Sequence, residues 1–541
     1  MKKIGNTGSF KKFYLNDQIY VDKTEYIYNL INNEARVFIS RPRRFGKSLT
    51  LDTIATLFET GVEPYFKGTW IYDKWTEPTY PVLRLNFLDL DKYSLEHFKQ
   101  KLNAIISSFA RDINVKNYEE KVEPEDTIYF LLDELRKEKR QIVILIDEYD
   151  CQMTANINNE TLYKQFQEKI KSFYATIKNK WPIKFLGITG VTRLKDVEIF
   201  SIGSDIKDIT NYSPYSQMIG FTRDEIKKYY IDYLKLAASY ENNCNVNNVT
   251  EAQIESLLDR LAKNYDGYCF DEDYEKKVFS TWSVNTFLQS VVDKKKVQFG
   301  EYWYDNGGLP SILVNYLKTH ELNIFEYLDK DKFLKVSSDD FKNPTALTTI
   351  NQNVLMCQTG YLTLRSDLNK TSTVALGIPN GEIYKALNRL LANNIFKGNT
   401  DITDDYGRSL LEVGTVDDII NLFNSALNSV SYDNYPIVSE SSVQNMLKLY
   451  LLGAHQKVLS EVHEAKGRAD LVVNTDNRRI VFEFKYAKNE TEAKSKLLDA
   501  VEQIKTRDYG NIVPKKTELL RIAAVFNADP KVRAFTEYQA V

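Results

Sequence analysis

Short apolar runs alternate with amphipathic stretches through the first half of the chain, a pattern that predicts strands separated by helices. The expected strands are runs of apolar residues, or apolar residues alternating with others, at 37–39, 81–87, 142–146 and 183–190. Apolar residues at helical spacing predict helices at about 94–112, 128–137 and 162–178. The run at 142–146 has no polar position, which is typical of a strand buried on both faces. We therefore expect an α/β domain with a parallel sheet.

The second half of the chain changes first to helical patterns and then to strands. Thr222, with Glu225 three residues later, forms a capping box that predicts the start of a helix. A helix that ends at Gly360, a hairpin and a further helix together resemble a winged-helix element. A helix and three strands then follow, at 442–453, 458–462, 467–473 and 479–485. This last group predicts a small α/β domain at the C-terminal end.

Composition limits the classes of protein that fit. A chain of 541 residues is too long to fold around one hydrophobic core, so about two to four domains are expected. The net charge of −3 excludes an overall basic field for nucleic acid, and any such binding needs a local patch. No apolar run approaches the roughly 18 residues of a membrane span, and the N-terminus lacks the apolar core of a signal peptide. Four widely spaced cysteines and four scattered histidines favour a cytoplasmic protein with reduced thiols and no zinc site.

A phosphate-binding loop is predicted directly after the first apolar run. The run breaks at Ser40, and Gly46-Lys47-Ser48 leads into a helical pattern. In such a loop, backbone amides hold phosphates, the lysine reaches the outer phosphates and the serine hydroxyl meets Mg²⁺. The usual pattern has a glycine at the position of Arg41. The candidate nucleotide-binding residues are Arg41, Arg43, Arg44, Phe45, Gly46, Lys47, Ser48 and Leu49.

Polar residues at the ends of two later strands complete a nucleotide site. Asp147 and Glu148 follow the fully apolar strand, where open α/β sheets place their ligands. Asp147 is expected to hold the Mg²⁺ water shell beside Ser48, and Glu148 to polarise the attacking water. Thr189 ends the next strand and is the candidate γ-phosphate sensor. Arg193 is expected either to neutralise developing charge, here or in a neighbouring molecule, or to form a surface salt bridge.

A second group of candidate catalytic and metal-binding residues lies near the C-terminus. Glu483 and Lys485 are two residues apart in a predicted strand, so they point to the same face. Pairing with the preceding strand brings Asp470 beside them. Two carboxylates and an ammonium then converge, which is enough to bind one or two Mg²⁺ ions and to activate a water. Solvated strand charges are the alternative interpretation.

Several blocks of the sequence resemble a known family. The chain is similar to bacterial AAA-ATPase-like proteins with a C-terminal domain of the PD-(D/E)XK nuclease superfamily. The resemblance covers nearly the whole chain, and its most specific block is residues 41–48, in which the family itself replaces the first glycine. The other matching blocks are 20–24, 145–150, 190–193, 219–222, 265–268 and 360–363.

The resemblance implies roles for the C-terminal residues. Asp470 and Glu483 would be metal ligands, and Lys485 would position or activate the nucleophile. Glu440 would supply the family's helix glutamate, and Gln503 its downstream glutamine. The expected architecture is a P-loop NTPase (AAA-like) parallel sheet with a helical lid and a winged-helix-like connector, followed by a restriction-endonuclease-like α/β domain. The expected boundaries are 1–235, 236–345, 346–432 and 433–541.

Two functions are expected from these sites. The first is an ATP-regulated, Mg²⁺-dependent DNA endonuclease, with ATP and Mg²⁺ as cofactors and nucleic acid as partner. The second is a nucleotide-dependent switch or nucleic-acid-binding protein in which neither site turns over. If Arg193 acts on a neighbouring molecule, the chain must form a homo-oligomer. Fold alone does not decide between these functions.

Overall fold

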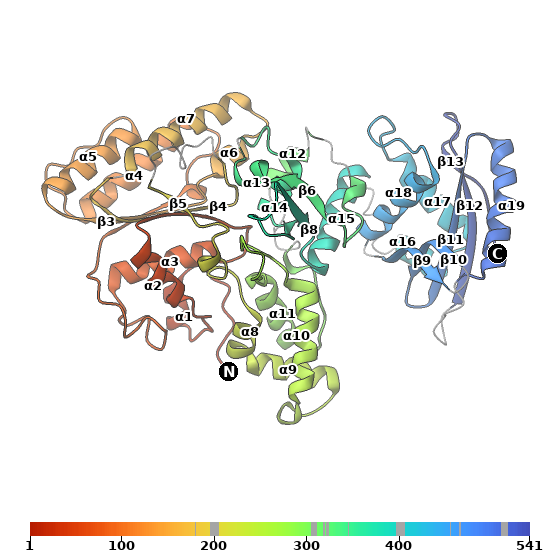
Figure 1. The fold of residues 1–541 in the computed structure, drawn as a ribbon, viewed down its shortest axis with the longest axis horizontal. Coiled ribbons are helices and arrows are strands. Elements are labelled where there is room, and N and C mark those ends of the chain that lie inside the picture. The colour runs from red at the N-terminus through yellow and green to blue at the C-terminus, as the bar shows by residue number, and fades with distance from the viewer. Residues whose placement is uncertain are drawn as a thin grey trace. The chain divides into compact units, whose positions relative to one another are not determined.

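The chain folds into two compact units. The computed structural model describes residues 1–178, 180–194, 205–303, 311–317, 320, 324–344, 346–396, 406–454, 456–464, 467–509 and 518–541. Unit 1 consists of Met1–His320 and Phe333–Ile383. Unit 2 consists of Glu321–Lys332 and Tyr384–Val541. Each unit is described by itself below (Figure 1).

A five-stranded parallel sheet forms the centre of unit 1. Its strands follow the order β2 (Val82–Asn86), β3 (Ile142–Asp147), β4 (Ile183–Gly190), β1 (Arg36–Ser40) and β5 (Lys207–Asp208). The four predicted strands and their parallel arrangement are confirmed. Strand β5 has only two residues, too few to show a pattern in the sequence. In the sheet, β4 lies between β1, which leads into the phosphate-binding loop, and β3, which ends at Asp147.

Helices cover both faces of this sheet. One face carries α1 (Phe10–Leu15), α2 (Thr24–Asn33) and α3 (Lys47–Thr60) (Figure 1). The other face carries α4 (Leu95–Asp112), α5 (Pro124–Lys137) and α7 (Glu160–Ile177), and the short α6 (Cys151–Ala155) follows β3. The predicted helices at 94–112, 128–137 and 162–178 correspond to α4, α5 and α7. Their amphipathic spacing arises because one side packs on the sheet.

The rest of unit 1 is a helical group and a small sheet. The helical group consists of α8 (Arg223–Tyr229), α9 (Ile231–Asn242), α10 (Glu251–Tyr265) and α11 (Thr281–Lys294). These helices share one core, which includes Leu234, Leu257, Leu261 and Phe287. The capping box of Thr222 and Glu225 is confirmed at the start of α8. The small sheet has the order β6 (Leu334–Ser337), β8 (Thr373–Gly377), β7 (Thr363–Leu364). The remaining helices of this part of unit 1 are α12 (Ser311–Leu317), α13 (Ser338–Lys342) and α14 (Gln352–Gln358).

Unit 2 is built on a mixed five-stranded sheet. The order is β13 (Ala534–Ala540), β12 (Glu518–Asn527), β11 (Arg478–Ala487), β10 (Gly467–Asn474) and β9 (Lys457–Glu464). Only β11 and β12 are parallel, and the other neighbours are antiparallel. One face packs against α19 (Glu490–Arg507) through Ala500 and Ile504. The remaining helices are α15 (Gly381–Ile395), α16 (Tyr406–Val413), α17 (Val416–Asn428) and α18 (Glu440–Gly453).

The boundaries of the two units differ from the predicted domain boundaries. The expected connector at 346–432 is shared between them, because unit 1 ends at Ile383. Helix α17 belongs to the unit 2 sheet: the Asn424 side chain donates to the Phe535 carbonyl (3.1 Å) and accepts from its amide (2.8 Å). The Phe423 ring lies 5.3 Å from the Phe482 ring of β11. The body that contains Asp470 and Glu483 therefore begins well before residue 433.

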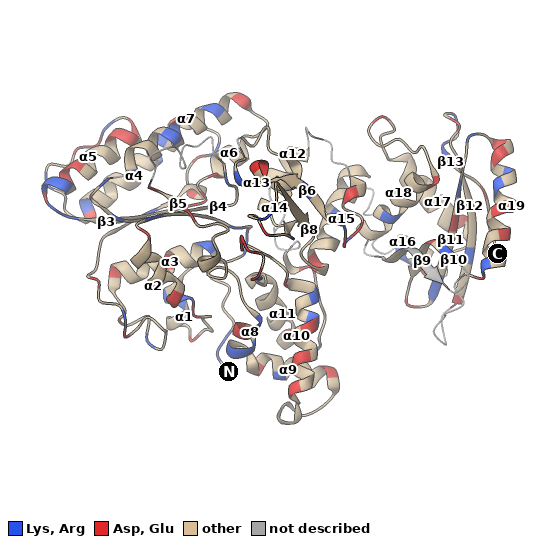
Figure 2. Cartoon of the chain, viewed as in Figure 1, with Lys and Arg blue, Asp and Glu red and all other residues tan. Residues whose placement is uncertain are grey.

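Surface charge is mixed in both units. Figure 2 shows acidic and basic residues on the same helices, for example on α5 and α19. This mixture agrees with 71 basic and 74 acidic residues in the chain. Among the described residues, none of the helices has the length and apolar character that a membrane crossing requires.

Candidate nucleotide and nuclease sites

The loop between β1 and α3 is shaped to receive an anion. Gly46 precedes α3 in the left-handed conformation (φ 105°), and no side chain caps this helix end. The first backbone N–H groups of α3 are therefore left for a ligand, and the helix dipole favours a negative one. Arg44 is also left-handed (φ 69°), which is uncommon for a residue with a side chain. Its guanidinium stacks on the Trp282 ring at 4.0 Å, and Thr281 donates to its carbonyl at 3.0 Å.

Lys47 is buried and turned back onto its own loop. Its Nζ donates to the carbonyls of Arg41 (3.0 Å) and Pro42 (3.3 Å). The same Nζ lies 3.6 Å from Oε1 of Glu148. Burial raises the pKa of the Glu148 carboxyl, and Lys47 opposes this shift. The lysine and the glutamate thus form an ion pair beside the phosphate-binding loop.

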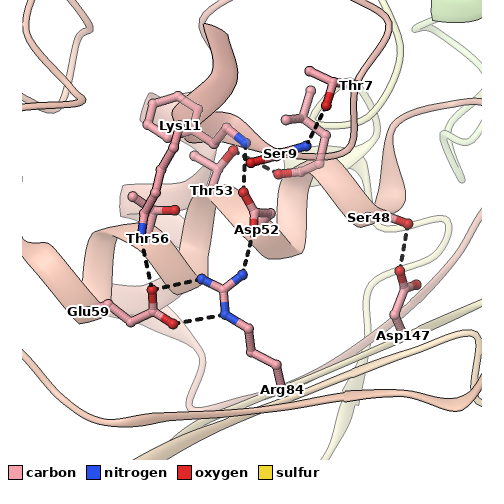
Figure 3. A network of polar contacts seen from close by, with 12 residues as sticks. Thr7, Ser9, Lys11, Ser48, Asp52, Thr53, Thr56, Glu59, Arg84 and Asp147 are labelled. Carbon is pink, nitrogen blue, oxygen red and sulfur yellow. Dashed lines mark hydrogen bonds and ion pairs between the residues drawn. The ribbon is translucent and has the colours of Figure 1, made fainter. Parts of the chain in front are cut away.

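Ser48, Asp147 and Thr189 come together at the ends of α3, β3 and β4. The Ser48 hydroxyl donates to Oδ2 of Asp147 at 2.6 Å (Figure 3). The Thr189 hydroxyl donates to Oδ1 of the same carboxylate. A hydroxyl and a carboxylate at this spacing are the hard oxygen ligands that Mg²⁺ takes beside phosphates. The residues present therefore fit a Mg²⁺ ion.

A cavity of about 680 Å³ extends from this loop. Arg43, Arg44 and residues 45–50 line one end, together with Glu148. Its volume lies within the range of ligand sites for molecules of nucleotide size. Lys23, Lys92 and Asp150 also line the cavity. Much of the remaining lining comes from residues that form no motif in the sequence: Gly5, Asn6, Thr7, Gly8, Ile19, Val21, Met218, Ile219, Gly220, Phe221, Tyr230, Trp282 and Asn285.

The C-terminal candidates converge on β10 and β11. The strands pair antiparallel with Leu471 opposite Phe482, so the next step along the ladder brings Asp470 opposite Glu483. Oδ2 of Asp470 accepts from the Phe484 amide at 2.8 Å. Lys485 Nζ lies 2.8 Å from Oε1 of Glu483 and 3.5 Å from Oε1 of Glu440. Glu440 is the first residue of α18, so this helix brings the fourth group to the strands.

Glu483 is an unusual carboxyl. Its side chain is 1% exposed, and Oε2 is buried without a hydrogen-bond partner. Burial raises its pKa to about 7, with a further contribution from Asp470. Burial would lower the pKa of Lys485, but the hydrogen bond and charge of Glu483 raise it. An orphaned buried carboxylate oxygen beside a second carboxylate is the arrangement that a cation would complete.

Asp470 and Glu483 suit a metal ion that takes only one or two of its ligands from the protein. Within the described ranges, no group of three or more His, Cys, Asp or Glu side chains is arranged to hold a metal. Mg²⁺ usually keeps several waters and takes only one or two carboxylates, with substrate phosphate completing the shell. Asp470 and Glu483 therefore fit Mg²⁺ and fit a fully protein-ligated ion poorly.

Comparison with protein families matches two parts of the chain. Residues 4–200 match the model of "Predicted AAA-ATPase", and residues 438–535 match that of the PD-(D/E)XK nuclease superfamily. The chain therefore carries an AAA-ATPase-like domain and a C-terminal domain of the PD-(D/E)XK nuclease superfamily. The first match includes the whole phosphate-binding loop and Asp147. The second includes Asp470, Glu483 and Lys485.

The proteins that this chain resembles along most of its length are distant. The chain is 25% identical over 532 residues to an uncharacterized protein in the vnfD 5′ region of Azotobacter chroococcum mcd 1, which covers 95% of this chain and 94% of that protein. The Walker-type ATPase PABY2304 of Pyrococcus abyssi is similar at 12% identity (TM-score 0.37; 68% of this chain, 94% of that chain). Cdc6p from Pyrobaculum aerophilum is similar at 11% identity (TM-score 0.25; 72% of this chain, 99% of that chain).

Two predicted residues of the AAA-ATPase-like domain point elsewhere. The Arg41 side chain is 1% exposed, stacks on the Phe270 ring at 4.1 Å and donates to the carbonyls of Ser40 (2.9 Å) and Thr210 (2.6 Å). Burial lowers its pKa to about 9. It does not line the cavity, so its expected charge beside the phosphates is corrected to a role in packing the loop from behind.

Arg193 is also outside the cavity. Its Nε pairs with Asp208, and its amide donates to Oε1 of Gln358 at 3.2 Å. A role for Arg193 in the site of its own chain is therefore not supported by this geometry. Its role in the site of a neighbouring molecule stays a prediction.

Two polar residues near Asp470 and Glu483, Gln444 and Arg507, were not predicted from the sequence, and Tyr509 was noted there only as lying beyond Gln503. Gln444, one turn after Glu440 on α18, donates to the Asp470 carbonyl at 2.5 Å. Tyr509 is buried, and its hydroxyl accepts from Gln503 (3.3 Å) and Arg507 (3.0 Å). The charges of Glu483 and Asp470 contribute to raising the pKa of Arg507, after its hydrogen bond to Tyr509. The helical spacing from Glu440 to Gln444 was the only signal available for the first of these.

Proposed function

We propose that this protein is a Mg²⁺-dependent DNA endonuclease whose cleavage is controlled by ATP bound to the AAA-ATPase-like domain. The observation that carries the proposal is the convergence of Asp470, Glu483 and Lys485 on one face of β10 and β11. The intact pair of Ser48 and Asp147 in unit 1 supports nucleotide binding in the same chain.

Each residue has a defined task in this proposal. Asp470 and Glu483 would hold Mg²⁺, which supplies charge stabilisation at the scissile phosphate. Lys485, fixed between Glu483 and Glu440, orients and polarises the attacking water. In unit 1, Lys47 would leave the carbonyls of Arg41 and Pro42 for the outer phosphates, while Glu148 orients a water.

The decisive experiment is a cleavage assay on plasmid and linear DNA with Mg²⁺, with and without ATP. Lys485→Ala is expected to lower cleavage by about 100-fold or more, because it removes the group that activates the water. Lys488→Ala, which changes an exposed lysine on the same segment, is the matched control. Lys47→Ala is expected to abolish only the ATP-dependent part of the activity. Uncut DNA under all conditions, with wild type and Lys485→Ala alike, would remove the endonuclease proposal.

A second candidate is a nucleotide-dependent switch with little turnover. It is favoured by the position of Arg193, which pairs with Asp208 and does not line the nucleotide cavity. Without a neighbouring molecule, the charge developing in phosphoryl transfer then lacks Arg193 as a partner. Tight ATP binding without phosphate release by the isolated chain supports this candidate, and rapid hydrolysis at high dilution contradicts it.

A further inference from the structure

The N-terminal segment of residues 5–10 forms one wall of the nucleotide cavity. Gly5, Asn6, Thr7 and Gly8 all line it, and α1 begins at Phe10. A Cβ added to Gly8 would lie 3.7 Å from the Cβ of Ser48. This end of the segment therefore sits beside the phosphate-binding loop. We call residues 5–10 the wall segment.

Asp52 anchors the wall segment to the P-loop helix. Its Oδ2 accepts from the Phe10 amide at 2.6 Å, and Ser9, at the N-cap of α1, makes no side-chain cap of its own. The carboxylate of α3 thus satisfies an N–H that the start of α1 leaves open. Asp52 is itself oriented by an ion pair with Arg84 of β2, as Figure 3 shows.

Arg84 is held in turn by a second acid of the same helix. Its Nε and Nη2 each lie 2.8 Å from the Glu59 carboxylate. Asp52 and Glu59 are two helical turns apart, so both face Arg84 from one side of α3. A two-pronged arginine–carboxylate contact fixes the direction of the guanidinium as well as its distance. The anchor is therefore tied to the central sheet.

Asn285 anchors the other end to the helical group. Its Nδ2 donates to the Gly5 carbonyl and to Oδ1 of Asn6, both at 3.1 Å. Its Oδ1 accepts from the Tyr230 hydroxyl at 2.6 Å. Asn285 lies on α11 and is 6% exposed, so its amide is fixed by buried partners.

We propose that Asp52 and Asn285 are positioning residues that hold the wall segment against the nucleoside part of the bound nucleotide. The Gly5 end of the segment is held by Asn285, which also contacts Tyr230 of the helical group, and Gly8 lies beside Ser48 at the start of α3. The loop and α3 receive the phosphates, so the wall segment is left for sugar and base. The inference rests on the proposed nucleotide binding and adds the part of the ligand that these residues serve.

The test compares two ligands by calorimetry of the full chain: Mg-ATP, which has a nucleoside, and Mg-tripolyphosphate, which has none. Asp52→Ala and Asn285→Ala are each expected to weaken ATP binding about fivefold to tenfold and to change tripolyphosphate binding less than about twofold. The loss of ATP affinity in the double variant is expected to be smaller than the product of the two single-variant losses, because both anchors act on one segment. Asp52→Asn keeps an oxygen acceptor for the Phe10 amide and is expected to restore most of the affinity.

Glu59→Gln is the graded comparison: it loosens Arg84 and the contact of Glu59 with Lys11 of α1 but keeps the bond from Asp52 to the Phe10 amide, so its loss of ATP affinity is expected to be smaller than that of Asp52→Ala. An equal loss for both ligands would show that the anchors act on the phosphate loop and would overturn the inference. Unchanged ATP binding in Asp52→Ala, with unfolding temperatures confirming a folded chain, would overturn it as well. If the wild type binds neither ligand, the proposed nucleotide binding itself fails.

Discussion

Replacing Glu483 with glutamine is expected to stabilise unit 2 in the absence of metal at pH 8. The carboxyl is buried, and its pKa rises from an ordinary value of 4.5 to about 7. Between these two pH values the folded chain keeps a proton that the unfolded chain releases, so stability falls as pH rises through this window. The full penalty is present above pH 7. Glutamine has nearly the same shape and no charge to bury.

The magnitude follows from the difference between the two pKa values. Each pKa unit corresponds to about 1.4 kcal/mol, so the penalty that glutamine removes at pH 8 is on the order of 3 kcal/mol. For a body the size of unit 2, this corresponds to a rise of roughly 6 to 12 °C in unfolding temperature. At pH 5 the gain is expected to be small. Magnesium is expected to stabilise the wild type at pH 8 and to leave the variant unchanged, because the variant has lost a ligand.

Calorimetric scans in EDTA at pH 5 and pH 8 measure this effect. The five tryptophans are at 70, 75, 181, 282 and 303, all in unit 1, so tryptophan fluorescence follows unit 1 separately. The fluorescence transition should be the same in wild type and variant. A variant that is equally stable or less stable at pH 8 would refute the reasoning, as would a gain of the same size at pH 5.

Three further changes test other parts of the structure. Gly190→Ala would place a Cβ 2.4 Å from the buried Tyr149 ring, and we expect unit 1 to lose about 1–3 kcal/mol in urea unfolding followed by tryptophan fluorescence. An unchanged midpoint would contradict this packing. Glu148→Gln should keep ATP binding and lose hydrolysis, measured by filter binding and phosphate release, and retained hydrolysis would exclude Glu148 as the water-orienting group. Phe423→Ala should destabilise unit 2 by about 3–5 kcal/mol in calorimetry, because the ring packs on Phe482, and a negligible effect would contradict the packing of α17 on the unit 2 sheet.

The strands and the carboxylate pair could be predicted because their signals are local. An uninterrupted apolar run ends at Asp147, and the short hairpin between β10 and β11 fixes which residues of the two strands face each other. Asp470 and Glu483 could therefore be paired from spacing alone. Ser48 and Asp147 were predicted together because parallel strands end at the same edge of a sheet.

The cavity walls could not be predicted, since their contacts are distant in sequence. Asn285 is hydrogen-bonded to Gly5, which lies 280 positions earlier in the sequence. The wall segment has no apolar periodicity from which it could be predicted. The direction of the Arg41 side chain depends on Phe270 and Thr210, which come from remote parts of the chain. Sequence spacing reports which residues share an element, and only the folded chain reports which way a loop side chain turns.

The order in which the chain builds its two units has a practical consequence. The polypeptide passes into unit 2 at Glu321, returns to unit 1 at Phe333 and passes back at Tyr384. Within unit 2, the early segment is joined to the later one by a hydrogen bond of 2.9 Å from the Tyr384 hydroxyl to the Leu328 carbonyl. A fragment that begins at residue 384 or 433 therefore lacks part of its own body. Separating the two units by proteolysis would need three cuts, and a separately produced unit 2 should include residues 321–332 as a second polypeptide.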